Sequence, residues 1–144
     1  MTVRVERTFE FTVSPERVWE FIADPEKRAR SISVVTDFEL KDESGREAIW
    51  HVHLPVPLLD TSAQVRTEEV ERDPPRHVKF VGRSKVMRVT GEHEVVPTEE
   101  GCELVNTFVV DGRLPGVERF FQRNLDNELD NLEAALRADL EVEA

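Results

Sequence analysis

Hydrophobic and polar residues alternate along most of the chain, which is the pattern of half-buried β-strands. In residues 3–13 the alternation places one set of side chains on a single face: Val3, Val5, Arg7, Phe9, Phe11 and Val13. Six later segments alternate in the same way and end at turn signals: residues 33–41, 46–54, 61–72, 77–81, 85–96 and 102–110. This order predicts an antiparallel sheet of six or seven strands.

Two short helices are expected between the first and second strands. Ser14 stands where it can cap a helix, and Pro15 suits the first helical position. The helix that follows carries four apolar residues, Val18, Trp19, Phe21 and Ile22. Asp24-Pro25 repeats the signal of a cap followed by proline and begins a second helix that ends near Arg30.

The end of the chain has a helical period instead. Seven apolar residues recur there at steps of three or four: Val117, Phe121, Leu125, Leu129, Leu132, Leu136 and Leu140. A helix of roughly 25 residues would be close to ~40 Å long, enough to cross the domain. Its apolar stripe has only the sheet to pack against, and a curved sheet around one long helix predicts a pocket.

Two segments carry a family pattern in addition. Residues 14–26 read SPERVWEFIADPE, and the tail runs from Arg119-Phe120-Phe121 through Leu125, Glu128-Leu129, Asn131-Leu132 and Ala135-Leu136. The first resembles the entry, and the second the closing helix, of the SRPBCC superfamily of START-like proteins. The superfamily includes polyketide cyclase/dehydrase-like members and others similar to a subunit of carbon monoxide dehydrogenase. The resemblance implies one α+β domain over residues 1–144, a helix-grip fold whose curved antiparallel sheet surrounds the C-terminal helix.

A helix-grip fold implies a deep hydrophobic cavity between sheet and helix, which holds lipids, polyketides, sterols or other apolar molecules. We expect eight residues to form its wall: Phe38, Trp50, Val52, Phe80, Val89, Phe108, Phe121 and Leu125. The fold does not select one chemistry, since its members include cyclases, hydratases, carriers and chaperone activators.

Charge narrows the possible partners. The 144 residues contain 30 Asp and Glu against 19 Lys and Arg, a formal net charge of -11. Such a surface lacks the basic face that nucleic acids or anionic lipids require. No segment is apolar enough for a signal peptide or a membrane span, so a cytoplasmic protein is expected.

The basic residues are unevenly divided between 15 Arg and 4 Lys. An even coat of carboxylates with few lysines is typical of proteins adapted to high salt, where the acidic groups keep the surface hydrated. An ordinary acidic protein is the simpler interpretation.

Histidines supply the first candidates for chemistry. His51 and His53 alternate with Trp50, Val52 and Leu54, which turns both imidazoles outward, and the lone Cys102 excludes a multi-cysteine metal site, so no metal or cofactor is expected. His93 shares the inward face with apolar neighbours. It is either a weak candidate for acid–base catalysis or a core histidine bonded to its surroundings.

Other polar residues fall on inward faces as well. Arg7 and Glu69 either point inward, where they would orient a ligand's polar group, or lie in solvent at a bulge. Asn106 and Thr36 are in phase with apolar residues and are candidate hydrogen-bonding groups on the wall. Glycine-rich phosphate loops and nucleophile elbows are absent, and so is tyrosine, a donor that enzymes of this superfamily often use on a bound carbonyl.

Three functions follow from these features. The first is binding of a small apolar ligand without strong catalytic machinery. The second is a polyketide cyclase/dehydrase-type reaction that uses His93 with Arg7 or Asn106. The third is a module that binds a protein partner, or a second copy of itself, and whose cavity is incidental.

The apolar loop Pro55-Val56-Pro57-Leu58-Leu59 stands where a polar turn is normal. It is either a lid over the mouth of the cavity or a cap on the bottom of the core.

Overall fold

Seven strands and three helices make up the computed structural model, which describes residues 2–43, 46–54, 62–114 and 116–143. The strands are β1 (Thr2–Phe11), β2 (Val35–Leu40), β3 (Glu47–His53), β4 (Ser62–Asp73), β5 (His77–Arg83), β6 (Met87–Pro97) and β7 (Cys102–Gly112). The helices are α1 (Pro15–Ile22), α2 (Pro25–Arg30) and α3 (Val117–Glu143). The expected order of strand, two short helices, six strands and one long helix is confirmed.

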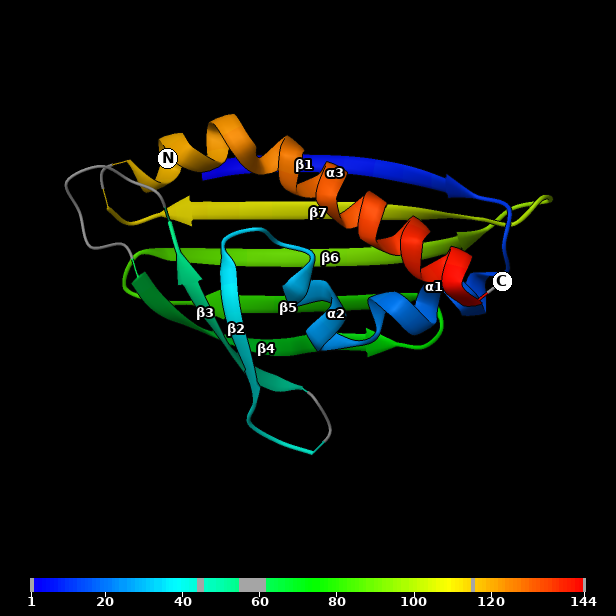
Figure 1. The fold of residues 1–144 in the computed structure, drawn as a ribbon, viewed down its shortest axis with the longest axis horizontal. Coiled ribbons are helices and arrows are strands. Elements are labelled where there is room, and N and C mark those ends of the chain that lie inside the picture. Colours follow the sequence, from blue (N-terminus) through cyan, green and yellow to red (C-terminus); the bar gives the residue numbers. More distant parts are fainter. Residues whose placement is uncertain (1, 44–45, 55–61, 115, 144) are drawn as a thin grey trace.

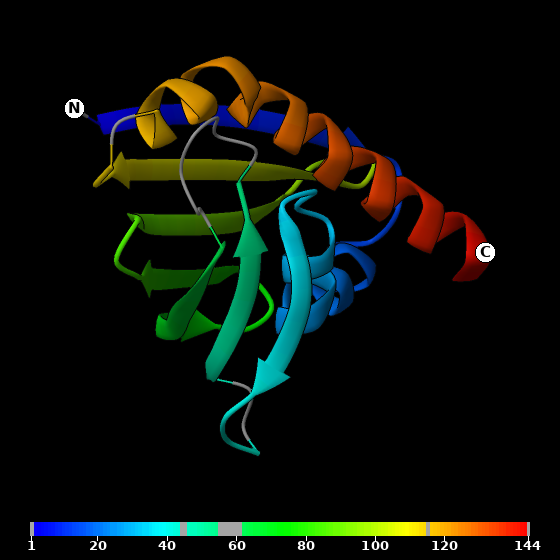
Figure 2. The same cartoon turned by 60° about the vertical axis from the view of Figure 1, so that its left-hand side comes forward.

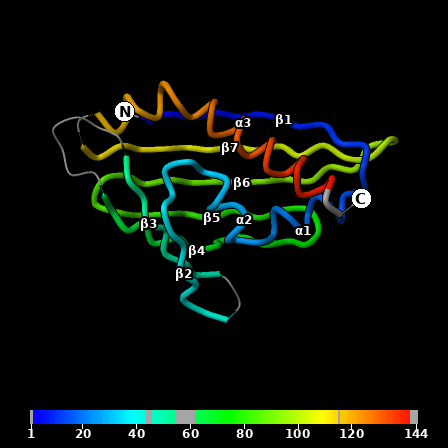
Figure 3. The backbone as a smooth tube through the Cα atoms, viewed as in Figure 1, coloured from blue at the N-terminus to red at the C-terminus, as the bar shows by residue number. Residues whose placement is uncertain are grey.

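All neighbouring strands pair antiparallel, in the order β1-β7-β6-β5-β4-β3-β2. The sheet curves, so that β2 and β3 cross the direction of the other strands (Figures 1 and 2). Helix α3 runs diagonally over the concave face, from the end where β1 begins to the end that carries α1 (Figure 3). This is the α+β helix-grip fold that the sequence predicts.

Local signals begin the helices, with one correction. Oδ1 of Asp24 accepts hydrogen bonds from the backbone nitrogens of Glu26 and Lys27, at 2.9 and 3.3 Å, and so caps α2. Ser14 occupies the cap position of α1, but its side chain makes no capping hydrogen bond. The start of α1 therefore depends on Pro15 and on burial of the four predicted apolar residues.

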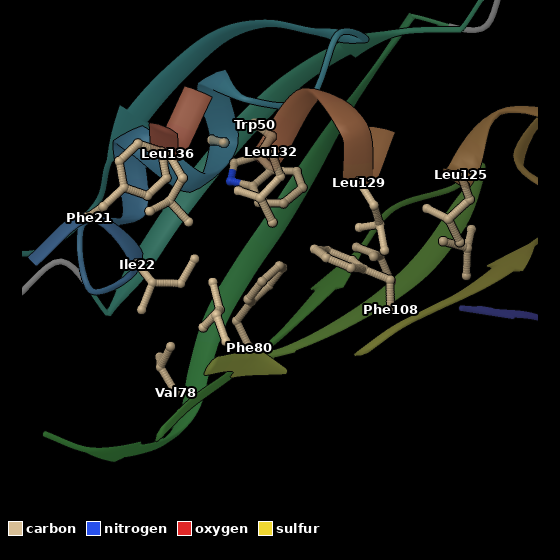
Figure 4. Packing of buried hydrophobic residues seen from close by; sticks show 14 of the residues in the cluster. Phe21, Ile22, Trp50, Val78, Phe80, Phe108, Leu125, Leu129, Leu132 and Leu136 are labelled. Carbon is tan, nitrogen blue, oxygen red and sulfur yellow. The ribbon is translucent and has the colours of Figure 1, made fainter. Parts of the chain in front are cut away.

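The apolar stripe of α3 packs on the concave face of the sheet (Figure 4). All seven of its predicted residues are buried. They join one continuous core with the inward-facing residues of the strands and the apolar residues of α1. None of the helices in the described ranges is both long enough and apolar enough to cross a membrane.

Two residues of β2 are exposed although they alternate in phase with buried Phe38: Thr36, which the sequence analysis placed on the wall, and Leu40. The register of β2 against β3 shifts between Val35 and Asp37, and Thr36 at this bulge is exposed, with its hydroxyl bonded to the backbone oxygen of His51 at 3.0 Å. Leu40 is 53% exposed because it stands at the end of the β2–β3 hairpin, which projects beyond the helices (Figure 2). The predicted loop Pro55–Leu59 lies outside the described residues.

Candidate functional site

An apolar cavity lies between the first half of α3 and the sheet. Strands β3, β6 and β7 and the segment between α2 and β2 form its other walls. The lining residues are Ile32, Val34, Val35, Trp50, Val52, Met87, Val89, Phe108, Val110, Phe121, Leu125, Glu128 and Leu129. The cavity occupies the place that the helix-grip resemblance implies.

Six of the eight expected wall residues line this cavity, and Phe38 and Phe80 do not. Phe80 belongs to β5 and is buried in the core, with its ring centroid 5.4 Å from that of Trp50. Gly91 makes room for it, since a Cβ at that position would collide with the Phe80 ring. Phe38 is buried in the core but faces no part of the cavity. The alternation along a strand correctly places both rings in the interior. It does not show which part of the interior is left as a cavity.

The cavity is small, with a volume of about 30 Å³. About 10–15 Å³ is enough to hold one water molecule, whereas pockets for drug-sized ligands are typically ~300–1,000 Å³. The side chains of the two layers therefore pack together, and a ligand of useful size has to push them apart.

Glu128 is the one ionisable residue among those that line the cavity in the described part of the chain. Its carboxylate accepts hydrogen bonds from the backbone nitrogen of Ser33, at 2.7 Å, and from the Ser33 hydroxyl. Only 6% of Glu128 is exposed. Glu128 is part of the sequence pattern of the closing helix. That pattern does not indicate that its side chain turns inward, because acidic residues beside a leucine stripe normally face solvent.

His93 is buried behind the cavity rather than on its wall. Its ring lies 5.5 Å from that of Phe108, edge to face, and stacks at 6.4 Å on Phe80. Nδ1 of His93 donates to Oδ1 of Asn106 at 2.7 Å, because the amide nitrogen of Asn106 is committed as a donor to the backbone oxygens of Arg7 and Leu104. The Nε2 atom has no hydrogen-bond partner among the described residues.

Burial disfavours the charged imidazolium, and the nearby positive charge of Arg28 acts in the same direction. Together they lower the pKa of His93 to about 3, although the hydrogen bond with Asn106 opposes the shift. At neutral pH the ring is therefore neutral, a poor proton donor with one buried lone pair. This geometry is that of a core histidine bonded to its surroundings.

Glu69 points inward, which is one of the two orientations that the sequence leaves open, and two arginines neutralise it. Its carboxylate lies 3.1 Å from Nη2 of Arg28 and 2.6 Å from Nη2 of Arg72. The two guanidinium groups also donate to the backbone oxygens of Ile22 and Ala23, at 2.7 and 2.8 Å. The network ties α1 and α2 to β4.

Burial of Glu69 favours its neutral form, but the hydrogen bond from Arg72 and the charge of Arg28 outweigh that effect and lower its pKa below the ordinary value. Arg28 also lies over the ring of Phe80, 5.4 Å from the centroid. The sequence contains no sign of the Arg28 partnership, because its partner on β4 is 41 residues away. These inward charges bind one another, and none of them lines the cavity.

The remaining sequence candidates also have partners elsewhere. Arg7 reaches the outer side of α3, where it pairs with Asp130 and donates to the backbone oxygen of Asp126 at 3.1 Å. His51 and His53 face away from the core, as expected, and bond to Glu39 and Ser62 respectively.

The sequence patterns did not indicate one cluster of charged and titratable side chains. His77 meets Glu92 at 2.6 Å through Nε2 and Glu71 at 3.7 Å through Nδ1, on the outer face of the sheet. The two carboxylates approach opposite edges of the imidazole, an ion-pair geometry across β4, β5 and β6.

Comparison of the chain with models of known protein families gives one match. Residues 2–137 match the family model described as "Polyketide cyclase / dehydrase and lipid transport". None of the curated proteins compared with the chain matches it in sequence.

Three of the solved structures that match share the fold across nearly all of their length. TTHA0849 from Thermus thermophilus is 23% identical, with a TM-score of 0.69 and coverage of 96% of this chain and 98% of that one. The ZhuI aromatase/cyclase from Streptomyces sp. R1128 is 16% identical, with a TM-score of 0.75 and coverage of 100% and 97%. A START superfamily protein from Mycobacterium smegmatis is also 16% identical, with a TM-score of 0.75 and coverage of 98% and 99%.

Proposed function

Because the chain belongs to the polyketide cyclase / dehydrase and lipid transport family, we propose that it binds a small apolar molecule between the sheet and α3. The cavity is the observation that carries this proposal, since all but one of its described lining residues are apolar. Burial of apolar surface supplies the affinity, at about 25 cal/mol per Å² removed from water. The ligand contacts include Trp50, Val52, Val89, Phe108, Phe121 and Leu125.

Binding requires the cavity to widen. Strands β3, β6 and β7 are held by backbone hydrogen bonds on both sides, so the sheet wall is the rigid one. Helix α3 packs on the sheet through side chains and is free of such pairing. We infer that the ligand enters by displacing the first half of α3 and rotating the side chains of Phe121 and Leu125.

Fluorescence offers a direct test, because the chain contains two tryptophans and no tyrosine. Trp50 lines the cavity, whereas Trp19 lies on α1 beside Arg72. In a Trp19→Phe variant, Trp50 is the single reporter, and titration with the neutral probe N-phenyl-1-naphthylamine should quench it by energy transfer. Mass spectrometry of small molecules released from the denatured, purified protein identifies the natural ligand.

Two valine variants form a matched pair for this titration. Val52 lines the cavity, and Val52→Phe should fill it and weaken binding of the naphthylamine at least tenfold. Val109 on β7 alternates with inward-facing Phe108 and Val110, so Val109→Phe enlarges the opposite face and should leave affinity unchanged. Equal affinity in both variants, or an unquenched Trp50 in the parent, contradicts the proposal.

A cyclase or dehydrase reaction is the second candidate, favoured by the family description and by the aromatase/cyclase among the similar structures. Such chemistry needs an acid or base that touches the ligand. His93, Asn106 and Arg7 are bonded elsewhere and do not line the cavity, which places this candidate second. The enzymatic function would become the first candidate if the protein converted a bound polyketide and if His93→Ala abolished that turnover while it retained binding.

A further inference from the structure

Three arginines form a row across the outer face of the sheet, the face opposite α3. Arg66 on β4 stands directly opposite Arg83 on β5, and Arg83 stands directly opposite Arg88 on β6. All three are exposed, because they alternate with inward-facing residues such as Val65 and Val89. Opposite side chains in a sheet have Cβ atoms about 4.5–5.5 Å apart, so three positive charges lie within roughly 10 Å. Neither the net charge of the chain nor the sequence spacing reveals this row, which the strand register creates.

No acid neutralises the row in the described part of the chain. None of the ion pairs or side-chain hydrogen bonds there includes Arg66, Arg83 or Arg88. The chain has 30 acidic against 19 basic residues, so a shortage of acids does not explain the lack of partners. Like charges directly opposite each other destabilise a sheet. An anion that binds across the row removes this repulsion.

A groove of about 460 Å³ adjoins the row, and Arg66 and Arg83 line it. Its volume lies within the ~300–1,000 Å³ that is typical of sites for small ligands. Lys41, just after β2, adds a third cation to the lining and forms no ion pair with a described residue. Unlike the cavity under α3, the groove is large enough for a small ligand as it stands.

The rest of the lining limits the anions that fit. Ile49, Val70 and Val81 give the groove an apolar surface. Glu47 and Glu68, directly opposite each other on β3 and β4, add two carboxylates. These carboxylates repel a polyanion that extends past the arginines, whereas a short phosphate chain can stay at the row. The lining therefore favours a short phosphate chain on an organic group over an extended nucleic acid.

We propose that the arginine row and the groove bind a small polyphosphorylated molecule, such as a nucleoside di- or triphosphate. A guanidinium binds phosphate oxygens through two parallel N–H donors, and three adjacent guanidinium groups suit a chain of phosphates. The phosphates lie along Arg66, Arg83 and Arg88, and the nucleoside packs on the apolar surface of the groove. This site is separate from the apolar cavity and does not depend on the proposed function.

A series of adenine compounds tests the assignment. Adenosine, AMP, ADP and ATP differ in the number of phosphates, and isothermal titration calorimetry at pH 7.5, in low salt and without Mg²⁺, measures their affinities. Affinity should rise with each added phosphate, by at least tenfold from AMP to ATP, and adenosine should not bind. Tripolyphosphate carries the same chain without the nucleoside and should bind more weakly than ATP.

Two charge-matched variants locate the site. Arg83→Gln removes the central guanidinium of the row and should weaken ATP binding at least tenfold. Arg4→Gln removes an exposed arginine on β1, at the edge of the sheet, and should change the affinity less than twofold. Because the two variants have the same net charge, the difference between them measures the row and not the overall field of the protein.

Four results overturn the inference. They are the absence of ATP binding, equal affinity for adenosine and ATP, equal effects of Arg83→Gln and Arg4→Gln, and tighter binding of single-stranded DNA than of ATP. Equal affinity for tripolyphosphate and ATP contradicts the role of the groove. None of these results bears on the apolar cavity, which the titration with N-phenyl-1-naphthylamine tests separately.

Discussion

A single imidazole shows how neighbours decide what a side chain can do. His93 would titrate near neutral pH if it were exposed, and its strand phase alone leaves a catalytic role open. In the fold it donates from Nδ1 to Asn106 and stands behind Phe80 and Phe108. Because its pKa falls to about 3, it enters the core as a neutral polar group rather than as an acid.

This shift makes stability depend on pH. The unfolded chain binds a proton at His93 below about pH 6.5, whereas the folded chain does so only near pH 3. Unfolding therefore takes up a proton in this window, and the free energy of unfolding falls as the pH drops. Between pH 7 and pH 5 His93 should account for a loss of about 2 kcal/mol.

Denaturant unfolding of the parent and of His93→Gln across this range measures that contribution. The variant should lose about 2 kcal/mol less than the parent between pH 7 and pH 5. The three other histidines are present in both proteins, so the difference isolates His93. Parallel pH profiles would mean that His93 is not buried as a neutral ring.

Helix α3 is the element on which both the core and the cavity depend. Leu129 and Leu132 are 1% and 4% exposed and lie against the aromatic residues of the sheet (Figure 4). Loss of a leucine side chain removes its transfer energy and leaves a void that the surroundings fill only in part.

We therefore expect Leu129→Ala or Leu132→Ala to lower the free energy of unfolding by roughly 2–5 kcal/mol. Asn131 lies between them on the exposed side of the same helix, so Asn131→Ala is the matched control and should change stability by less than ~0.5 kcal/mol. Equal, small effects at the leucines and at Asn131, in urea titrations of all three, would contradict the packing of α3.

At the scale of the whole molecule the dominant feature is charge. A net charge of -11 spread over 144 residues destabilises a compact state through self-repulsion at low ionic strength. The few basic groups that reach the interior, such as Arg28, are already committed to internal acids. The surface is left with an excess of carboxylates that salt can screen and hydrate.

If the acidic surface is an adaptation to salt, the melting temperature should rise from low salt to molar KCl. Screening of like charges is nearly complete by a few tenths molar, where the Debye length is only several ångströms. A continued rise above that concentration, followed by differential scanning calorimetry, indicates ion-specific hydration. A melting temperature that stops rising at a few tenths molar indicates an ordinary acidic protein.

The helices, the strands and the fold class follow from the sequence, because each depends on local patterns. Alternation at period two specified the strands, Asp24-Pro25 specified a capped helix, and the leucine stripe specified which face of α3 is buried. Turn residues between short strands left few topologies other than an antiparallel sheet. A change of register, as at Thr36, is the kind of local detail that such patterns miss, because the pairing strand decides it.

The roles of the inward polar residues depend on how distant segments pack together in the fold. Phase placed His93 and Asn106 on the inward face and left Glu69 either inward or in solvent, and their partners come from segments far away in the chain or from a neighbouring strand. The same holds for Glu128, whose orientation depends on how α3 sits over the sheet and on the position of Ser33. A cavity is the space that packing leaves between distant elements. Its size and its lining residues are therefore set only when those elements are brought together.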